Sequence, residues 1–253
     1  MLITYPNIII FILLDMVVCP CNNKVIDTFK PFNKRNNAKC PSCDSLERHR
    51  LVIMFFNKYN ITFKKTLHIA PEHQLTKLFT SISNEYICGD IDVEKYKKYN
   101  LNIINIDITN ISFKNEFDCI FASHVLEHII DDKKAMKEIY DALVFDGRFF
   151  ALVPQDFNRK DTYEDISIVS EEDRLKHFGQ KDHVRWYGLD FSQRLKDAGF
   201  YIKVHYTEAS TQFINNMIFD EKNQLATNEE AEKYRFSRAD IIFECIKKPI
   251  LSN

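Results

Sequence analysis

Four cysteines near the N-terminus have a type and spacing that suit metal binding. Cys19 and Cys21 form a C-x-C pair, and Cys40 and Cys43 form a C-x-x-C pair. Four thiolates in two close pairs are the usual ligand set of a structural zinc site. Chelation by a C-x-C pair is geometrically tighter, so two metal-free pairs, reduced or crosslinked, are the alternative. We expect zinc bound by all four sulfurs.

Acidic residues follow three successive candidate strands. Glu72 comes shortly after the run TLHI, Asp90 ends the run YICGD, and Asp107 follows the run IINI. A single acid in such a position is usually a solvated turn former. Three in succession are expected to meet at the carboxyl edge of a parallel sheet, where ligands bind.

Histidines are the candidate general bases. Residues 123–128 read SHVLEH, and a further histidine lies in the later motif DHVRWYG. Histidine is the side chain best matched to proton removal at neutral pH. Glu127 can orient one of these rings, or can simply occupy the first turn of a helix, where a negative charge is favourable.

The elements that position these residues alternate along the chain. Short β-branched or aromatic runs alternate with amphipathic segments, which predicts an α/β fold with a mostly parallel seven-stranded sheet and helices on both faces. Asp44, with Glu47 three residues on, predicts the start of the first helix. The candidate strands are 66–69, 86–90, 103–106, 117–122, 148–153, 200–206 and 240–246, and the candidate helices are 73–82, 93–98, 132–144 and 189–198. Two long polar stretches, 155–188 and 208–238, do not fit the alternation.

Residues 117–154 carry the longest ordered pattern: a strand that begins with FD, then HVLEH, a helix, and an Asp-Gly turn before the next strand. This pattern resembles the fourth-to-fifth strand region of class I S-adenosylmethionine (SAM)-dependent methyltransferases. With CPC, CPSCDSLERHR, LHIAPE and DHVRWYG in order, the chain is similar to a bacterial subgroup associated with surface polysaccharide and sugar modification. The resemblance covers nearly all of residues 18–207. It implies a Rossmann-like fold and SAM as cofactor, with S-adenosylhomocysteine as product.

The resemblance also implies how SAM is held. Glu72 is expected near its ammonium group and Asp107 at the adenine amino group. Asp90 is expected at the ribose hydroxyls, with Asp92 as the alternative if the strand ends two residues later. Ala70 stands where most of the class has glycines, and this is tolerable because SAM has no pyrophosphate that would need a glycine-rich cradle. The expected cofactor-binding residues are His68, Ala70, Glu72, Asp90, Asp107, Ile108, Ser123 and His124.

The polar stretch 155–188 is expected to bind the methyl acceptor. Its arginines and histidines suit an acceptor that carries phosphate, carboxylate or many hydroxyl groups, because guanidinium groups bind anions through paired hydrogen bonds. A solvated charged loop with Trp186 packed inward is the other interpretation. The expected substrate-binding residues are Arg174, His177, Gln180, His183, Arg185 and Tyr187. We rank His124 first as catalytic base and His183 second, and treat His128, one helical turn from His124, as structural.

Composition limits the functional classes. The net charge of −2 and the sequence pI of about 6.5 argue against a general nucleic-acid binder. The absence of GxGxxG counts against a dinucleotide oxidoreductase. An RNA methyltransferase and a SAM-binding or nucleotide-binding module without turnover are the alternatives to a methyltransferase that acts on a small sugar or phosphate-containing molecule.

The N-terminus is expected to be neither a membrane span nor a signal peptide. The apolar run 7–14 is too short to cross a bilayer, and no Lys or Arg precedes it. The odd number of cysteines fits a reducing compartment, so a cytoplasmic protein is expected. We divide the chain into an apolar extension (1–17), a cysteine-rich zinc-binding segment (18–43) and a methyltransferase domain (44–253). Met16 is a second possible start of the natural protein, and most of the apolar extension lies upstream of it.

Overall fold

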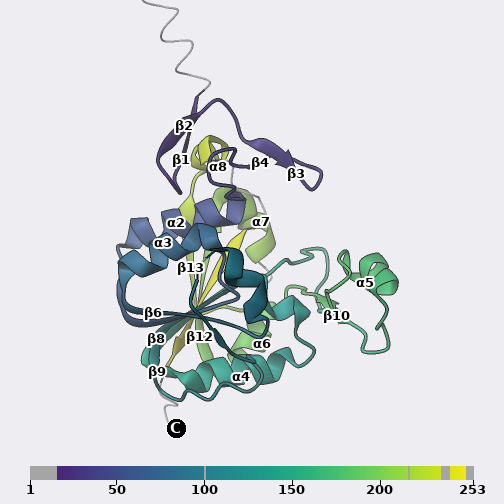
Figure 1. Cartoon of the computed structure of the whole chain (residues 1–253). Helices are drawn as coiled ribbons and strands as arrows, with labels where there is room; N and C mark the ends of the chain where they lie inside the picture. The colour runs from purple at the N-terminus through teal and green to yellow at the C-terminus, as the bar shows by residue number, and fades with distance from the viewer. Residues whose placement is uncertain (1–15, 100, 216, 235–239, 249–253) are drawn as a thin grey trace, which may run out of the picture.

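An eight-stranded sheet forms the centre of the computed structural model, which describes residues 16–99, 101–215, 217–234 and 240–248 (Figure 1). The strand order is β13-β12-β14-β9-β8-β5-β6-β7. Strands β5 to β9 are mutually parallel, and β14 runs antiparallel to both of its neighbours. The strands are β5 (Phe63–Ile69), β6 (Ser83–Asp90), β7 (Ile103–Asn105), β8 (Phe117–Ser123), β9 (Leu143–Leu152), β12 (Phe200–Thr207), β13 (Glu221–Ala226) and β14 (Ile241–Lys247).

The predicted α/β fold is confirmed, with one strand more than expected. The extra strand is β13, which pairs in parallel with β12 at the edge of the sheet. It lies in the stretch 208–238, where its sequence EKNQLA carries too few apolar residues to indicate a strand. Residues 1–15 of the predicted N-terminal extension lie outside the described residues.

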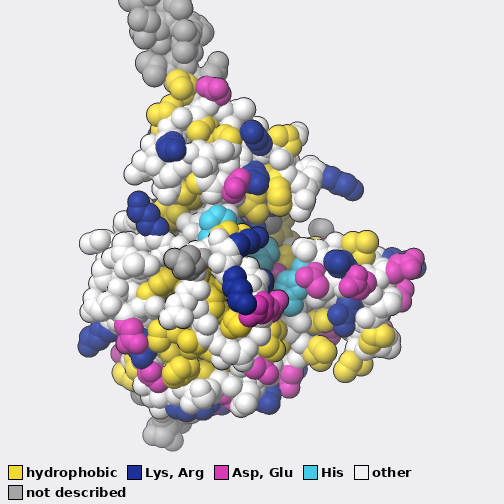
Figure 2. All heavy atoms as spheres, viewed as in Figure 1, with side chains coloured by type: hydrophobic (Ala, Val, Ile, Leu, Met, Phe, Trp, Pro, Cys, Tyr) yellow, Lys and Arg dark blue, Asp and Glu magenta, His cyan; other side chains and the backbone are white. Residues whose placement is uncertain are grey.

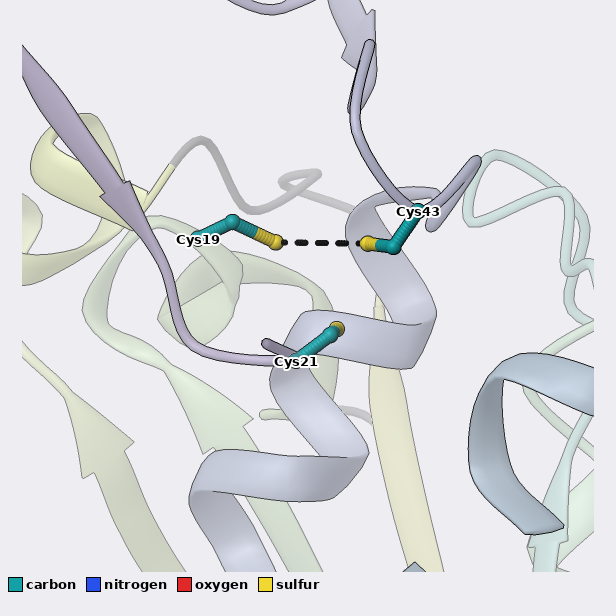
Figure 3. A group of neighbouring side chains, drawn as sticks. All are labelled: Cys19, Cys21 and Cys43. Carbon is teal, nitrogen blue, oxygen red and sulfur yellow. Dashed lines mark hydrogen bonds between the residues drawn. The ribbon is translucent and has the colours of Figure 1, made fainter. Parts of the chain in front are cut away.

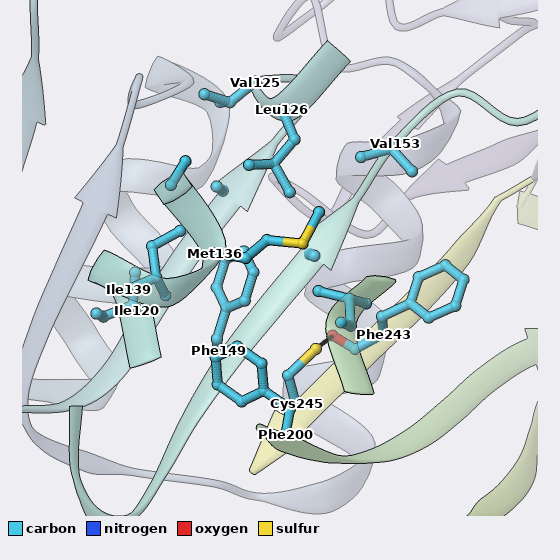
Figure 4. Packing of buried hydrophobic residues seen from close by; sticks show 14 of the residues in the cluster. Ile120, Val125, Leu126, Met136, Ile139, Phe149, Val153, Phe200, Phe243 and Cys245 are labelled. Carbon is cyan, nitrogen blue, oxygen red and sulfur yellow. Dashed lines mark hydrogen bonds between the residues drawn. The ribbon is translucent and has the colours of Figure 1, made fainter. Parts of the chain in front are cut away.

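Helices cover both faces of the sheet and so create two hydrophobic cores. Along β8, Cys119 and Phe121 face the core under α2 (Glu47–Tyr59) and α3 (His73–Ile82). Ile120 and Ala122 face the core under α4 (Asp132–Ala142) and α6 (Phe191–Asp197), part of which is drawn in Figure 4. This alternation is the period of two that a strand imposes.

Among the helices of the described ranges, none is both long enough and apolar enough to span a membrane.

Shorter helices complete the fold. The predicted helix 93–98 is a 3₁₀ helix. The short helices are η1 (Val93–Tyr99), η2 (Leu126–His128), η3 (Glu208–Ser210), α7 (Thr211–Ile214) and α8 (Asn228–Tyr234).

The cysteine-rich segment forms two small hairpins above α2, close to α8 (Figure 1). Arg50 of α2 anchors it: the guanidinium is fully buried, Nη1 donates to the carbonyls of Ala38 (3.0 Å) and Ser45 (3.1 Å), and the group lies 3.9 Å from the ring centroid of Phe29. The hairpin strands are β1 (Val17–Cys19), β2 (Lys24–Ile26), β3 (Lys30–Phe32) and β4 (Arg35–Lys39).

The start of α2 differs from the prediction. The helix begins at Glu47, with Leu46 as the N-cap residue, and the Leu46 N–H donates to Nδ1 of His49 (3.0 Å). Asp44 instead adopts a left-handed backbone conformation (φ 59°) and forms an ion pair with Lys39 (2.9 Å). The predicted N-cap, Asp44, therefore lies two residues before the observed one.

The stretch 155–188 projects from the body, at the right of Figure 1. It contains β10 (Tyr163–Glu164), α5 (Glu171–Phe178) and β11 (Arg185–Trp186), and β10 pairs antiparallel with β11. We call it the excursion. Gly179 ends α5 at φ 78°, and a Cβ there would lie 2.8 Å from Trp186, so only glycine fits. Trp186 is thus partly covered by the end of this helix.

Candidate active site

The carboxyl ends of β5, β6 and β7 enclose a small pocket of about 70 Å³. Asp90 and Asp107 supply its carboxylates, and the loop after β8 closes it through Val125. Ile91, which is 67% exposed, flanks the pocket on the solvent side. The other lining residues are Ile69, Ala70, Ile106, Ile108 and Ile129.

Backbone geometry brings these strand ends close together. Ala70 has φ 48°, a left-handed conformation that is uncommon for a residue with a side chain, and its N–H donates to the Gly89 carbonyl (2.8 Å). A Cβ at Gly89 would lie 2.8 Å from Cδ1 of Ile106. Glycine at this position therefore allows β6 to pack against the pocket wall.

Asp90 is buried and fixed in orientation. Its Oδ1 accepts from the Asp92 N–H (2.8 Å), and its Oδ2 accepts from the Tyr96 hydroxyl (2.7 Å) and lies 2.6 Å from Nζ of Lys95. A carboxylate has about four acceptor sites, so room for a ligand hydroxyl is left.

Asp107 is exposed and forms a local turn. Its Oδ1 accepts from both the N–H and the hydroxyl of Thr109 at 2.8 Å, and these hydrogen bonds lower the pKa of Asp107. It faces the pocket as a carboxylate.

Glu72 lies between two residues of α2 that the sequence analysis did not single out. Its Oε1 accepts from Nε of Arg48 (3.0 Å) and from Nε2 of His49 (2.8 Å). His49 accepts the Leu46 N–H at Nδ1, so the proton on its ring is at Nε2, and burial lowers its pKa and keeps it neutral. Burial alone would raise the pKa of Glu72, but His49 and Arg48 outweigh it and hold the pKa well below 4.5. The motif SLERHR, which follows the second cysteine pair and contains Arg48 and His49, was the sequence feature that could have pointed to these two residues.

The second oxygen of Glu72 is buried and has no hydrogen-bond partner in the described ranges. A buried carboxylate oxygen without a donor is unfavourable unless a ligand supplies one. The structure therefore leaves an acceptor near the end of β5 that suits an ammonium group.

Four titratable side chains meet where β8 passes into η2. Glu127 is fully buried, and its Oε1 lies 3.3 Å from Nδ1 of His124 and 3.9 Å from Nε2 of His128. The ring of His183, which comes from the excursion, is centred 4.8 Å from that of His128. We call these four residues the histidine cluster. Figure 2 shows histidine side chains gathered on one face, between the upper N-terminal part and the excursion at the right.

Several predicted site residues lie elsewhere. His68 is fully buried under α3, where its ring packs against Phe79 and Phe121, and burial lowers its pKa to about 3. It therefore faces away from the pocket, and the structure does not support a contact with cofactor. Ser123 is buried at the end of β8, and its hydroxyl has no hydrogen-bond partner among the described residues.

Arg185 and Tyr187 are committed to the protein interior. Arg185 is 3% exposed and donates to the carbonyls of Leu126 (3.0 Å), Ile129 and Ile130 (2.8 Å). The Tyr187 hydroxyl donates to Oδ2 of Asp132 (2.7 Å) and lies 3.2 Å from the carbonyl oxygen of Leu126, and its side chain is fully buried. Both residues fasten the excursion to η2 and α4. The structure does not support direct substrate contact by either.

The other predicted acceptor residues lie on or near α5. His177 contacts the Tyr163 hydroxyl through Nδ1 (2.8 Å), Nε of Arg174 donates to the Ile168 carbonyl (3.4 Å), and Gln180 is exposed beyond the helix end. None of these three joins the histidine cluster.

Comparison with known proteins finds a family model that matches part of the chain. Residues 73–151, from α3 to β9, match the family model of a methyltransferase domain. Over this stretch the chain therefore carries a methyltransferase domain. The matched stretch of the methyltransferase domain contains Asp90, Asp107 and three members of the histidine cluster. A search of the curated proteins found no match.

Solved structures share the fold of this methyltransferase. A SAM-dependent methyltransferase from Archaeoglobus fulgidus has a TM-score of 0.51 at 16% identity, over 79% of this chain and 94% of that chain. The YcgJ protein of Bacillus subtilis gives 0.50 at 16%, over 79% and 99%. The 1,6-didemethyltoxoflavin-N1-methyltransferase of Burkholderia thailandensis, solved with bound 1,6-didemethyltoxoflavin and S-adenosylhomocysteine, has a TM-score of 0.50 at 11% identity, over 80% of this chain and 79% of that chain. At such identities the likeness shows the fold alone.

A larger groove of about 660 Å³ separates the excursion from the start of α4 in the methyltransferase. Three basic residues line it, Lys133, Arg174 and Arg185, but so do four acidic ones and several isoleucines and valines. Ile166 is 85% exposed there. The acidic lining residues are Asp131, Asp132, Glu164 and Asp165.

The cysteine-rich segment of the methyltransferase brings three predicted zinc ligands together. The sulfurs of Cys19, Cys21 and Cys43 lie within 4.8 Å of one another, and those of Cys19 and Cys43 face each other at 3.7 Å (Figure 3). A hydrogen bond from Cys21 lowers the pKa of Cys19 to about 4, which favours the thiolate that binds metals. Cys40 is buried beside them, and its sulfur accepts the Ser42 N–H (3.4 Å). This donor set suits zinc.

Proposed function

We propose that this methyltransferase transfers the methyl group of SAM to a hydroxyl oxygen of a small sugar-type acceptor. The observation that carries the proposal is the contact of His124 with buried Glu127, directly beside the strand-end pocket. Methyl transfer from SAM is an in-line displacement, so the protein has to align the reactants and remove one proton. A histidine held against a carboxylate can remove that proton.

In this proposal the strand ends hold SAM, which supplies an activated methyl group when bound. Asp90 accepts the ribose hydroxyls, Asp107 and the isoleucines bind the adenine, and the second oxygen of Glu72 accepts the ammonium group. Ala70 and Ile108 provide close backbone and apolar contact.

His124 acts as the base. Its Nδ1 faces Glu127, which leaves Nε2 for the acceptor hydroxyl. As the acceptor oxygen attacks the methyl carbon, Nε2 takes the hydroxyl proton, and the nearby carboxylate stabilises the imidazolium that forms. The carbon–sulfur bond breaks, and S-adenosylhomocysteine leaves. His183 is the second candidate, and burial lowers its pKa, so it is neutral at pH 7.

The charges of the excursion favour a hydroxylated acceptor over a strongly anionic one. The guanidinium of Arg185 is satisfied by backbone carbonyls, and His177 contacts Tyr163. The groove beside Arg174 is lined by four acidic and three basic side chains. A sugar, with many hydroxyls and little charge, fits such a surface better than a phosphate-rich molecule, and better than RNA. Such an acceptor is in keeping with the surface-polysaccharide subgroup that the sequence motifs resemble.

We further propose that the protein works in the cytoplasm. All seven cysteines are unpaired in the structure, and a reducing compartment keeps them so. This state is also the one that lets the N-terminal cysteines bind zinc.

The test is methyl transfer from radiolabelled SAM to a panel of sugar nucleotides, phosphorylated metabolites and RNA. Label should enter a sugar nucleotide. His124→Ala should then lower kcat on the order of 100-fold, the usual contribution of a general base, with unchanged affinity for S-adenosylhomocysteine. His73→Ala, a ring stacked on Tyr99 outside the cluster, is the matched control and should keep wild-type kcat. Labelling of RNA alone, or full turnover by His124→Ala, would disprove the assignment.

A further inference from the structure

Glu127 is a buried carboxylate without a hydrogen-bond donor. Its side chain has no exposed surface, and within the described ranges neither of its oxygens accepts a hydrogen bond. A buried, ionised carboxylate is strongly unfavourable unless a positive charge or donors compensate it. The nearest candidates for compensation are imidazole rings.

The orientation of His128 is fixed by the excursion. Its Nδ1 lies 3.1 Å from the carbonyl oxygen of Asp182, which can only accept, so Nδ1 carries the ring proton. Nε2 of the same ring faces Oε1 of Glu127 at 3.9 Å, which is too long for a hydrogen bond. The space between these two atoms suits a cation.

His183 completes the set from the other chain segment. The residue is 1% exposed, and neither ring nitrogen has a hydrogen-bond partner in the described part of the chain. The adjacent Val184 N–H donates to the Glu127 carbonyl (3.0 Å), which holds the two segments in register. The ligand atoms of Glu127, His128 and His183 all lie within 4.8 Å of one another.

We propose that Glu127, His128 and His183 bind one divalent transition-metal ion. Two imidazoles and one carboxylate are the protein ligands of many catalytic zinc sites and of non-haem iron sites, and they leave coordination positions open. Donation of the other ring N–H to a backbone carbonyl, as in His128, is the usual arrangement around a metal-bound histidine. Ligand atoms around one ion lie at most about 4.2 Å apart, so small side-chain rotations close the site.

The position of this metal site gives it a use. His124 stands beside Glu127 and is about one-third exposed, so the open coordination positions lie next to the proposed base. An acceptor hydroxyl bound to the ion would lose its proton more readily. This use rests on the proposed function, whereas metal binding itself does not.

The test measures zinc in the full chain, without SAM or acceptor. Chelator-treated protein is dialysed against Zn²⁺ under reducing conditions, and zinc per chain is determined by elemental analysis for wild type, Glu127→Gln and His128→Ala. Each variant should hold one zinc ion per chain fewer than wild type. Any zinc held by the cysteines is common to all three proteins and cancels in the difference.

His73→Ala serves as the control and should hold the wild-type amount. Zn²⁺ should also raise the melting temperature of wild type more than that of His128→Ala. The His128 side chain is 30% exposed, so we do not expect its removal to impair folding. A wild-type zinc content in either cluster variant would overturn the proposal and would leave Glu127 paired with a protonated imidazole instead. Because no methyl transfer is measured, this result is independent of the function assay.

Discussion

At the scale of single residues, the charge of Glu72 depends on two neighbours from α2. Arg48 and His49 both reach Oε1, and together they outweigh the effect of burial on the pKa of Glu72. The same pair leaves the other oxygen available to a ligand. The carboxylate is therefore part of the stability of the fold as well as a candidate for binding the ammonium group of SAM.

Glu72→Gln should change how stability depends on pH. A carboxyl whose folded-state pKa lies below its unfolded value stabilises the fold fully above about pH 4.5, and this contribution is lost as the pH falls below that value. Wild type should therefore exceed the variant in free energy of unfolding at neutral pH, with the difference shrinking in acid. Urea titrations at a series of pH values check this. A pH-independent difference would show that the pKa of Glu72 is not lowered.

Some residue-level predictions were within reach of the sequence, and others were not. Ala70, Asp90 and Ile108 line the pocket, as expected for residues at strand ends. His68 was misplaced because both faces of a parallel strand are buried. The apolar residues on both sides of His68 therefore do not indicate which face of the sheet His68 occupies. The pairing of Glu72 with Arg48 joins segments far apart in sequence, and no local pattern predicts it.

At the scale of elements, a buried guanidinium is one of the groups that hold the excursion to the body. Arg185 joins β11 to backbone carbonyls of η2 and of the loop after it, and its Nε donates to Glu164 of β10 (2.8 Å). From the sequence we expected Arg185 to bind the acceptor. The sequence could not tell whether this side chain points toward a substrate or inward, because arginine serves in both places.

Arg185→Ala should therefore destabilise the protein. Removing one partner of a buried ionic network leaves the other partners unsatisfied and lowers the free energy of unfolding by about 3–5 kcal/mol. A lower urea midpoint and faster proteolysis within 155–188 would show this loss. Arg159→Ala removes an exposed ion pair with Asp156 in the same excursion and should cost less than about 1 kcal/mol. Wild-type stability in Arg185→Ala would contradict its structural role.

The cysteine-rich segment is the other element whose stability can be tested. If its cysteines bind zinc, Cys43→Ser should lower the zinc content by one ion per chain and expose the segment to protease, while affinity for S-adenosylhomocysteine stays unchanged. Ser42→Ala, at the neighbouring exposed position, is the control. Equal zinc content and equal protease resistance in Cys43→Ser would rule out a zinc ion at this site.

At the scale of the whole molecule, the site arises from topology. Parallel strands β5 to β8 bring their carboxyl ends to one edge, so residues from Ala70 to His124 meet there although more than fifty positions separate them. Alternating apolar and amphipathic runs were enough to predict this arrangement. The edge strand β13 escaped prediction because tertiary pairing, and not its own sequence, stabilises it.

The central claim is that this edge binds SAM through Asp90. Calorimetric titration with S-adenosylhomocysteine should show one site per chain, and Asp90→Asn should weaken binding roughly 10- to 100-fold, as expected for lost hydrogen bonds to a charged group. Asp92→Asn, two residues on and outside the pocket lining, should bind like wild type. Unchanged affinity in Asp90→Asn would contradict the account.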